Sequence, residues 1–293
     1  MTDAIAEAHV PHPRRPYDPL IINLAPTGMV PTTARVPHVP VTPEAIVDTA
    51  ARCFDLGARI IHLHARGPDE RPDWRRGAYE RIIPALRERC PGVVVCVTTS
   101  GRDEPGFAER SDVLRLTGDA KPDMASLTLG SLNFRTSASV TDPDMIRRLA
   151  ETMGEAGIKP ELELFDAGMV YMAAELLARG VLQAPLYANV LLGSLGTAPA
   201  RADDLVHLTR ALPPGTVWAA AGIGAFQLPM TALATFMGGH VRTGLEDNPH
   251  LDHRTRADTT NEQLVERAAA LAATAQREIA TPAWTRTALG LPS

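Results

Sequence analysis

The stretch Ile60-Ile61-His62-Leu63-His64-Ala65-Arg66 is the segment from which the fold can be predicted. Its apolar, β-branched run predicts a buried strand. Side chains two residues apart on a strand point to the same face, so His62 and His64 would lie side by side, within reach of one metal ion. A strand histidine is more often a core residue, but burying two without partners would cost on the order of a few kcal/mol. The pair therefore favours a metal site, which needs a third protein ligand and an open position for chemistry.

The same kind of run recurs along the chain. An apolar run, a polar turn and a helical period alternate about eight times, which favours a single (β/α)8 TIM barrel in the α/β class. An open, doubly wound sheet is the alternative. The barrel is preferred because polar residues recur at the carboxyl ends of nearly every strand, where such barrels place their active sites. The expected strands are 20–25, 59–64, 93–97, 124–128, 161–165, 186–192, 216–221 and 240–244.

The chain is expected to hold one folded domain. Residues 1–19, with prolines and paired arginines, are expected to be a flexible lead-in, and 20–293 a catalytic barrel that ends in a helical tail. Pro84 is expected to kink the helix at 79–89 or to delay its start, because proline lacks the backbone N–H. The last long helix is expected to span 261–278.

Composition argues against several function classes. The net charge is −5, and no basic run with interleaved aromatic residues suggests a nucleic-acid surface. No apolar run approaches the roughly 20 residues of a membrane span. The first residues lack the basic-then-apolar order of a signal peptide. Cys53, Cys90 and Cys96 are interpreted as reduced core thiols of a cytoplasmic protein.

Two acidic residues follow the eighth expected strand. Because strands 8 and 2 of a closed barrel share a rim, Glu246 would complete a His-His-Glu set that leaves positions open for a substrate. Asp247 would point elsewhere and act as a base. Arg242, within the strand, would hold the Asp247 carboxylate ionised and oriented. The simpler interpretations are a solvated turn for the acidic pair and a buried ion-pair partner for the arginine.

Polar residues at other strand ends suggest substrate contacts. Thr98-Thr99-Ser100-Gly101 offers hydroxyls and backbone N–H groups that suit a carboxylate or carbonyl, although it is equally typical of a strand-to-helix turn. Ser126 and Thr128 repeat the theme two residues apart. Glu161 and Glu163 share one face of the fifth strand and are interpreted as structural carboxylates.

A glycine pair adds weak support for a nucleotide-bearing substrate. Gly222-Ile223-Gly224 resembles part of a phosphate loop, although G-x-G alone is weak. Because barrel loops after strands 7 and 8 commonly hold phosphate groups, the pair suggests a nucleotide-bearing substrate such as a coenzyme A thioester.

These stretches together resemble the β-keto acid cleavage enzymes, typified by 3-keto-5-aminohexanoate cleavage enzyme. The resemblance runs from about Leu20 to the end of the chain. Its landmarks are Ala25-Pro26-Thr27-Gly28, Ile61-His62-Leu63-His64-Ala65-Arg66, Met124-Ala125-Ser126-Leu127, Gly130-Ser131-Leu132-Asn133-Phe134, Pro160-Glu161-Leu162-Glu163, Ala220-Ala221-Gly222-Ile223-Gly224 and the run from Gly238 to Asn248.

The resemblance implies a zinc-dependent (β/α)8 enzyme, usually a homotetramer. Such enzymes condense a β-keto acid with acetyl-CoA and release acetoacetate and a new acyl-CoA. By resemblance, the zinc ligands are His62, His64 and Glu246, and the base is Asp247 with Arg242 as its partner. The implied substrate contacts are Thr98, Gly101, Ser126 and Thr128, of which the first, third and fourth are similar to the typical residues but not identical.

One departure bears on the substrate. The aminohexanoate enzyme has, in the loop after strand 1, a glutamate that pairs with the substrate amino group, and Val30 stands at the matching position here. An apolar side chain cannot hold an ammonium ion. The expected substrate is therefore a β-keto acid without a nearby cationic amine, for example an aliphatic one.

Two other readings of the histidine pair stay open. Amidohydrolases also carry His-x-His in a metal-bearing barrel, but on the first strand, with further histidines on strands 5 and 6. Here the pair lies on strand 2, and 161–165 and 186–192 contain no histidine. In a non-catalytic barrel zinc would be structural or absent, yet structural zinc normally has four ligands, mostly cysteine, and none of the cysteines is suitably spaced from His62.

Overall fold

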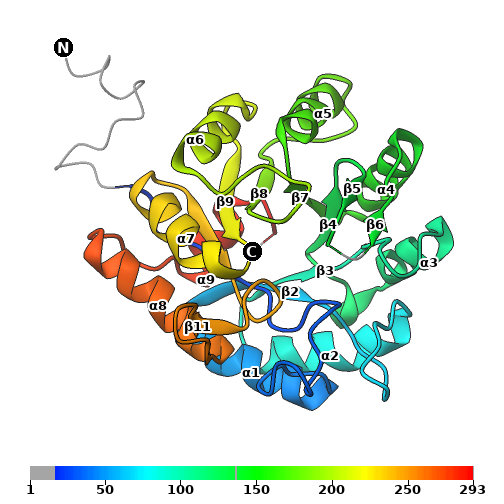
Figure 1. Cartoon of the computed structure of the whole chain (residues 1–293). Coiled ribbons are helices and arrows are strands. Elements are labelled where there is room, and N and C mark those ends of the chain that lie inside the picture. The colour runs from blue at the N-terminus through cyan, green and yellow to red at the C-terminus, as the bar shows by residue number, and fades with distance from the viewer. Residues whose placement is uncertain (1–16, 136, 293) are drawn as a thin grey trace, which may run out of the picture.

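The computed structural model describes residues 17–135 and 137–292 and shows a closed barrel of parallel strands ringed by helices (Figure 1). Each expected strand is present, with ends shifted by no more than two residues, so the predicted (β/α)8 barrel is confirmed. Around the barrel the strands follow the order β1-β10-β9-β8-β7-β4-β3-β2. Their bounds are β1 Ile22–Leu24, β2 Ala58–Leu63, β3 Val94–Val97, β4 Met124–Thr128, β7 Lys159–Leu164, β8 Tyr187–Leu192, β9 Val217–Gly222 and β10 His240–Thr243.

The helices form the outer layer. Several begin where the sequence offers a capping side chain: Thr42 and Asp142 each accept from the backbone N–H three residues ahead, and a proline follows each cap. Within the described residues no helix is both long and apolar enough to cross a lipid bilayer. The helices are α1 Pro43–Asp55, α2 Arg76–Arg89, α3 Phe107–Asp112, α4 Pro143–Ala156, α5 Ala167–Ala178, α6 Ala202–Ala211, α7 Gln227–Phe236, α8 Asn261–Thr274 and α9 Pro282–Ala288.

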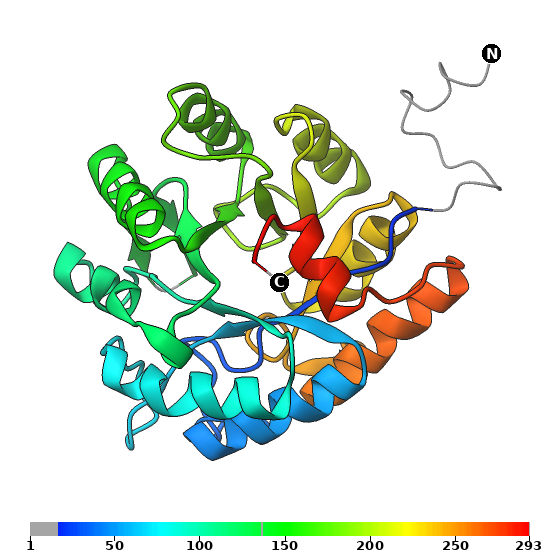
Figure 2. The ribbon, with the colours of Figure 1, turned by 180° about the vertical axis from the view of Figure 1, so that it is seen from behind.

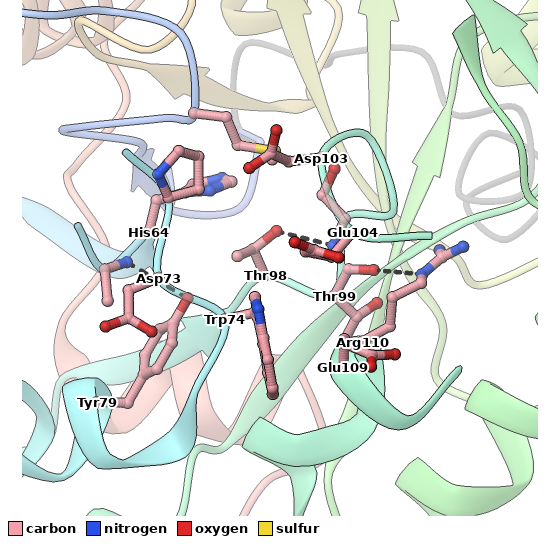
Figure 3. A pocket seen from close by; sticks show the side chains of 14 residues that line it. His64, Asp73, Trp74, Tyr79, Thr98, Thr99, Asp103, Glu104, Glu109 and Arg110 are labelled. Carbon is pink, nitrogen blue, oxygen red and sulfur yellow. Dashed lines mark hydrogen bonds between the residues drawn. The ribbon is translucent and has the colours of Figure 1, made fainter. Parts of the chain in front are cut away.

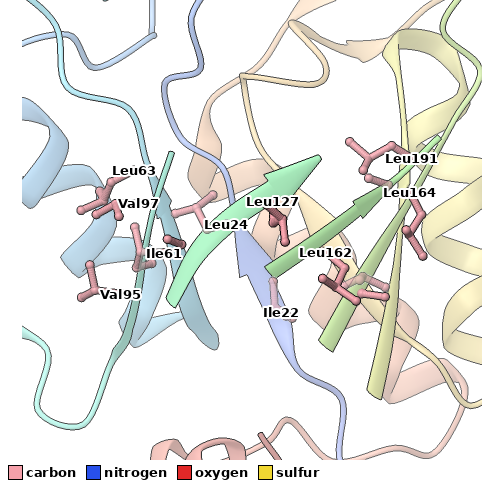
Figure 4. Close-up of a cluster of buried hydrophobic side chains, with 14 of the residues drawn as sticks. Ile22, Leu24, Ile61, Leu63, Val95, Val97, Leu127, Leu162, Leu164 and Leu191 are labelled. Atoms are coloured by element: carbon pink, nitrogen blue, oxygen red, sulfur yellow. The ribbon is translucent and has the colours of Figure 1, made fainter. Parts of the chain in front are cut away.

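Alternation along each strand separates two kinds of buried side chain. On β2 and β3, Ile61, Leu63, Val95 and Val97 belong to the large apolar cluster between the strands and the helices (Figure 4). The intervening residues face the barrel axis, and on β2 these include His62. The strand periodicity therefore directs the polar side chains inward while the helix contacts stabilise the barrel from outside.

The amino-terminal end of the barrel is filled and covered. Ile60, Val94 and Tyr187 form a second apolar cluster there, against which Trp284 packs and to which Leu289 belongs. Figure 2 shows α9 crossing this end of the barrel, which locates the predicted helical tail. The opposite, carboxyl end is left for the polar residues.

The structure corrects two helix predictions. The helix that contains Pro84 does not start late, because it begins at Arg76 and runs to Arg89; a kink at Pro84 stays a prediction. One missing backbone hydrogen bond is outweighed by burial of the helix face that includes Ile82 and Leu86. The helix expected to reach residue 278 ends at Thr274.

Tertiary contacts explain the early end of α8. The chain after it leaves the helix with Gln276 at a positive φ of 55° and pairs Ile279 with Leu20 as a bridge. The buried Arg277 between them donates to the carbonyl oxygens of Thr235, Gly239 and Asp18. Residues 1–16 of the expected lead-in lie outside the described residues.

Two short hairpins were not expected from the sequence. β5 (Leu132–Asn133) pairs with β6 (Ala138–Ser139), and β11 (His250–Asp252) pairs with β12 (Ala257–Asp258). They follow the carboxyl ends of β4 and β10, respectively. Strands of two or three residues are too short to show an alternating pattern, which is why sequence periodicity missed them.

Gly244 fixes the turn that carries Glu246 and Asp247. Its φ is +144°, and a Cβ built there would lie 2.1 Å from the carbonyl oxygen of Ala25. We expect Gly244→Ala to lower the free energy of unfolding by about 3 kcal/mol or more, because backbone strain adds to a clash with backbone. Urea unfolding measures this. Gly118→Ala is the control, since that glycine also has a positive φ but no heavy atom within 4 Å; equal losses in the two variants would contradict the clash.

Candidate active site

The first feature of the carboxyl end is a set of three metal-ligand side chains. His62 and His64 come from β2 and the residue after it, and Glu246 from the turn after β10. One ligand atom from each lies within 4.8 Å of the others. The two Nε2 atoms are 3.2 Å apart, and Nε2 of His64 is 3.3 Å from Oε1 of Glu246. The barrel thus brings together the residues that the sequence placed on its second and eighth strands.

Glu246 can occupy this position because the loop after β1 has no side chain at the point of contact. Gly28 lies against its side chain, and a Cβ on Gly28 would be 2.5 Å from Cγ of Glu246. The backbone N–H of Glu246 donates to the carbonyl oxygen of Ala25 at 3.2 Å. The site therefore requires a glycine at position 28, because any larger residue would displace the side chain of Glu246.

His62 is held from behind by Glu161. Its Nδ1 lies 2.6 Å from Oε2 of Glu161, so Nδ1–H donates to the carboxylate, and Nε2 is the ring nitrogen that faces His64. Asn23 and Cys96 also donate to Glu161, at 2.7 and 3.1 Å. Burial raises the pKa of Glu161, but the attraction of His62 and Arg242 outweighs it and the pKa falls to about 2. Glu161 is therefore an ionised carboxylate that fixes the ring of a candidate metal ligand.

Glu161→Gln is expected to weaken metal binding by about 10–100-fold, because the carboxylate that orients His62 and raises its basicity is lost. Competition with a chromophoric chelator gives the metal dissociation constant without an activity assay. Glu155→Gln, at an exposed position on α4, is the matched control. Unchanged affinity in Glu161→Gln would show that His62 needs no such support.

The donor chemistry fits a divalent metal ion. Burial lowers the pKa of His64, and the nearby Glu246 carboxylate only partly offsets this, which favours the neutral imidazole that metals bind. Burial also opposes ionisation of Glu246, but His64 and Arg242 outweigh it and lower the pKa. Within the described residues Oε2 of Glu246 has no hydrogen-bond partner although it is buried. Two imidazole nitrogens and a carboxylate oxygen that converge in this way offer three ligand atoms to one cation.

Arg242 links the acidic residues of the site. It is 1% exposed, and its Nε donates to Oδ2 of Asp247 at 3.1 Å. Its Nη2 lies 3.0 Å from Oε1 of Glu246, and its Nη1 lies 3.6 Å from Oε1 of Glu163. The predicted contact between Arg242 and Asp247 is therefore present.

The net pKa of Asp247 is raised although Arg242 contacts it. Burial raises this pKa; Arg242 lowers it, the neighbouring Glu246 raises it again, and the net shift is upward. Desolvation and the charge of Glu246 both come from the tertiary structure, and together they exceed the effect of the arginine. A carboxylate with a raised pKa is better suited to accept a proton from carbon.

Several residues of the site line a cavity of about 510 Å³ at the carboxyl end of the barrel. Its wall joins the barrel axis to the loops above it. Among the residues predicted from the sequence, it includes Val30, His64, Thr128, Arg242, Glu246 and Asp247. Apolar lining comes from the loops after several strands, including Phe134, Phe165, Leu195 and Phe226. The cavity therefore has a polar floor and a largely apolar upper wall.

A smaller cavity of about 30 Å³ adjoins it and shares Met29, His64 and Ser100 (Figure 3). Thr98 lines this smaller cavity, and its hydroxyl accepts from the backbone N–H of Ser100 at 3.1 Å. Thr98 therefore lies beside His64, as a substrate contact would.

Two of the predicted substrate contacts, Ser126 and Gly101, are not among the residues that line either cavity. The Ser126 hydroxyl accepts from the backbone N–H of Thr99 at 3.2 Å, and Gly101 packs against Arg110, which a Cβ would approach to 2.7 Å. In this structure both residues shape the strand-end turn, and their direct contact with substrate stays a prediction.

The two carboxylates of β7, Glu161 and Glu163, contact residues of the candidate site. Both were interpreted as structural, yet Glu161 supports His62, and Glu163 lines the cavity and accepts from Thr128 at 2.7 Å. The available signal was their i, i+2 spacing at the carboxyl end of a strand, the same signal that singled out the histidines.

The sequence matches known proteins over nearly its full length. Residues 19–291 match the model of a family described as beta-keto acid cleavage enzyme. The chain is 39% identical over 278 residues to the 3-oxoadipate:acetyl-CoA acetyltransferase of Cupriavidus necator, covering 94% of this chain and 96% of that protein. It is 38% identical over 273 residues to the 3-keto-5-aminohexanoate cleavage enzyme of Fusobacterium nucleatum, covering 93% and 98%.

Solved structures support the fold. The apo structure of ObcA superposes with a TM-score of 0.77 at 22% identity. The match covers 88% of this chain and 66% of that one. At this identity the likeness shows a shared barrel architecture.

Proposed function

The chain belongs to the beta-keto acid cleavage enzyme family, and on this premise we propose that it is a zinc-dependent enzyme that transfers an acyl group between a β-keto acid and acetyl-CoA. The reaction converts R–CO–CH2–COO⁻ and acetyl-CoA into R–CO–S-CoA and acetoacetate. One C–C bond forms, one breaks, and the CoA thiolate moves from the acetyl group to the R–CO group. The single observation that carries the proposal is that His62, His64 and Glu246 converge on one point, and that His64 and Glu246 line one cavity together with Asp247.

The roles of the side chains follow from their positions. A zinc ion held by His62, His64 and Glu246 would supply a Lewis acid for the ketone of the substrate. Asp247 would take the proton from the carbon between the carboxylate and the ketone. Arg242 orients Asp247 through the 3.1 Å hydrogen bond. Because this carboxylate is buried and its pKa is raised, it is a stronger base than an exposed aspartate.

The later steps need donors for developing negative charge. The carbanion attacks the acetyl thioester carbonyl and expels the CoA thiolate. The thiolate then attacks the ketone that came from the β-keto acid. A reverse Claisen cleavage releases acetoacetate, whose carbanion recovers a proton. Hydroxyl and backbone N–H groups from Thr98 to Gly101 would steady the carboxylate and the oxyanions.

Val30 bears on the choice of β-keto acid. It lines the main cavity and is 53% exposed, so an apolar side chain occupies the position expected to bind an amino group. We expect turnover of substrates with a cationic amine to be much weaker than turnover of β-keto acids without one. Comparable kcat/KM values for the two kinds would contradict this expectation.

The experiment is a screen of β-keto acids with acetyl-CoA and the zinc-loaded protein. Mass spectrometry identifies the acyl-CoA product. Acetyl-CoA that is isotopically labelled in its acetyl group should transfer the label to acetoacetate. Acetoacetate that carries no label, or turnover without acetyl-CoA, would contradict the proposed transfer. Hydrolysis of plain amides or lactones would favour the amidohydrolase alternative. The cytoplasmic location and the homotetramer stay predictions, the second to be checked by sedimentation.

A further inference from the structure

A buried arginine that the proposed reaction does not use holds the loop after β1. Arg66 comes two residues after His64 and is 5% exposed. Its Nε donates to the carbonyl oxygen of Gly28 at 2.8 Å, and its Nη2 donates to that of Pro31, also at 2.8 Å. Its Nη1 donates to the carbonyl oxygen of Glu70. All three nitrogens of the guanidinium therefore bind main-chain carbonyl groups of two loops.

The charge of Arg66 has no carboxylate beside it. Within residues 17–135 and 137–292, no ion pair closer than 4.0 Å includes this side chain. Burial lowers its pKa, and the carboxylates of Glu246 and Glu70 offset this only in part. A buried charge is costly unless hydrogen bonds satisfy it, so the guanidinium depends on the carbonyl groups just as the loop depends on the guanidinium.

The two carbonyl groups of the β1 loop flank the residues that face the substrate. Met29 and Val30 lie between Gly28 and Pro31, and both line the main cavity. Met29 also lines the smaller cavity beside His64. A two-residue segment that is anchored at both ends has little freedom to move its side chains. Arg66 therefore determines where this part of the cavity wall lies.

A second link joins the same two loops. The carboxylate of Glu70 accepts from the backbone N–H of Thr33 at 2.9 Å and from the Thr33 hydroxyl. Arg66 pairs with Pro72 as an antiparallel bridge, which closes the turn that carries Glu70. The loop after β2 is thus a closed turn that holds the loop after β1 at three of its residues.

We propose that Arg66 is a positioning residue of the proposed reaction, because it holds Met29 and Val30 as the wall against which the β-keto acid binds. The inference rests on the proposed function, since it concerns the substrate of that reaction. Arg66 lines neither cavity, so it acts through the loop and not by contact with the substrate. Its effect should therefore appear in substrate binding and not in the chemical step.

Arg66→Lys keeps the charge, but one ammonium group cannot span the three carbonyl groups. The KM for the β-keto acid should rise by about 10–100-fold, the range set by loss of a hydrogen bond from a charged donor. The kcat should change by less than about threefold, since Asp247 is held by Arg242 from β10. Val30→Ala should raise the KM by about 3–10-fold in wild type and by a smaller factor in Arg66→Lys, where the wall is already displaced.

Arg277→Lys is the matched control. Arg277 is 4% exposed and also donates to three carbonyl oxygens, at the amino-terminal end of the barrel. This variant should lose stability in urea as Arg66→Lys does, yet keep the wild-type KM and the full effect of Val30→Ala. An equal rise in KM in the two lysine variants would reduce the role of Arg66 to general stability and overturn the inference.

Limited proteolysis tests the loop without turnover. Arg35 lies at an exposed position in the loop after β1. Trypsin cleavage after Arg35, identified by fragment mass, should be about 10-fold faster in Arg66→Lys than in wild type, because cleavage follows the population of the open loop. Arg277→Lys should be cleaved there at the wild-type rate.

Glu70→Gln provides a second variant at a partly exposed position, for the case that Arg66→Lys does not fold. It weakens the link to Thr33 and should raise the KM for the β-keto acid by about 3–10-fold, with kcat unchanged. An unchanged KM in this variant and in any folded Arg66→Lys, even with faster cleavage after Arg35, overturns the inference and leaves the proposed function standing. If wild type converts no β-keto acid with acetyl-CoA, the proposed function fails, and the substrate role of Arg66 fails with it whatever the cleavage rates.

Discussion

Replacing Asp247 by asparagine is expected to lower kcat by about 10²–10⁴-fold, the contribution of a positioned general base. The amide cannot accept the proton from the carbon between carboxylate and ketone, while its shape and its contact with Arg242 can be kept. Asp247 is not one of the three grouped metal-ligand residues, so metal content should be unchanged. Steady-state kinetics and metal analysis on the same preparation measure the two quantities.

A second measurement separates loss of the base from general damage. Wild type should exchange the acidic proton of a β-keto acid with deuterated water when acetyl-CoA is omitted, and Asp247→Asn should not. Asp119→Asn, in an exposed turn before β4, is the matched control and should retain both activities. A kcat for Asp247→Asn within a few-fold of wild type would assign the proton transfer to another group, with Glu163 the cavity carboxylate that is not grouped with the candidate metal ligands.

Replacing His64 by alanine is expected to weaken metal binding by more than about 10²-fold and to abolish turnover, because one of three protein ligands is lost and cannot be replaced from the second layer. His64 is buried, and its Nε2 lies between Nε2 of His62 and the carboxylate of Glu246. Competition with a chelator measures the affinity, and circular dichroism of the metal-free protein checks the fold.

His207→Ala is the control for this change, because His207 lies at an exposed position on α6. It should leave metal affinity and kcat unchanged. Should His64→Ala fail to fold, His64→Gln retains a polar side chain and tests the same ligand. Full metal content and activity in either variant would mean that the assignment of His62, His64 and Glu246 is wrong.

Much of the fold was predictable because it depends on short-range periodicity. Alternation along β2 assigns Ile61 and Leu63 to the helix-facing side and His62 to the axis, whatever the rest of the chain does. Capping residues such as Thr42 and Asp142 mark the starts of helices, because each side chain accepts a hydrogen bond from the backbone N–H three residues ahead. The early end of α8 was not predictable, because it depends on pairing between Ile279 and Leu20 from the far end of the chain.

The same distinction between local patterns and tertiary contacts applies to the residues of the candidate site. The residue types at strand ends, together with the family resemblance, were enough to name His62, His64, Glu246 and Asp247. They were not enough to identify Glu161 as the carboxylate behind His62, since that contact needs the two strands to face each other across the barrel.

The sequence by itself therefore determined the alternation of strands and helices, the inward face of each strand and the donor atoms offered at the carboxyl ends, because these depend on local geometry. Only the tertiary structure decided which donors meet. Barrel closure brings Oε1 of Glu246 to within 3.3 Å of Nε2 of His64. It also buries Asp247, and this burial raises the pKa of the carboxylate. Distances and desolvation across the barrel depend on closure, and no local pattern encodes them.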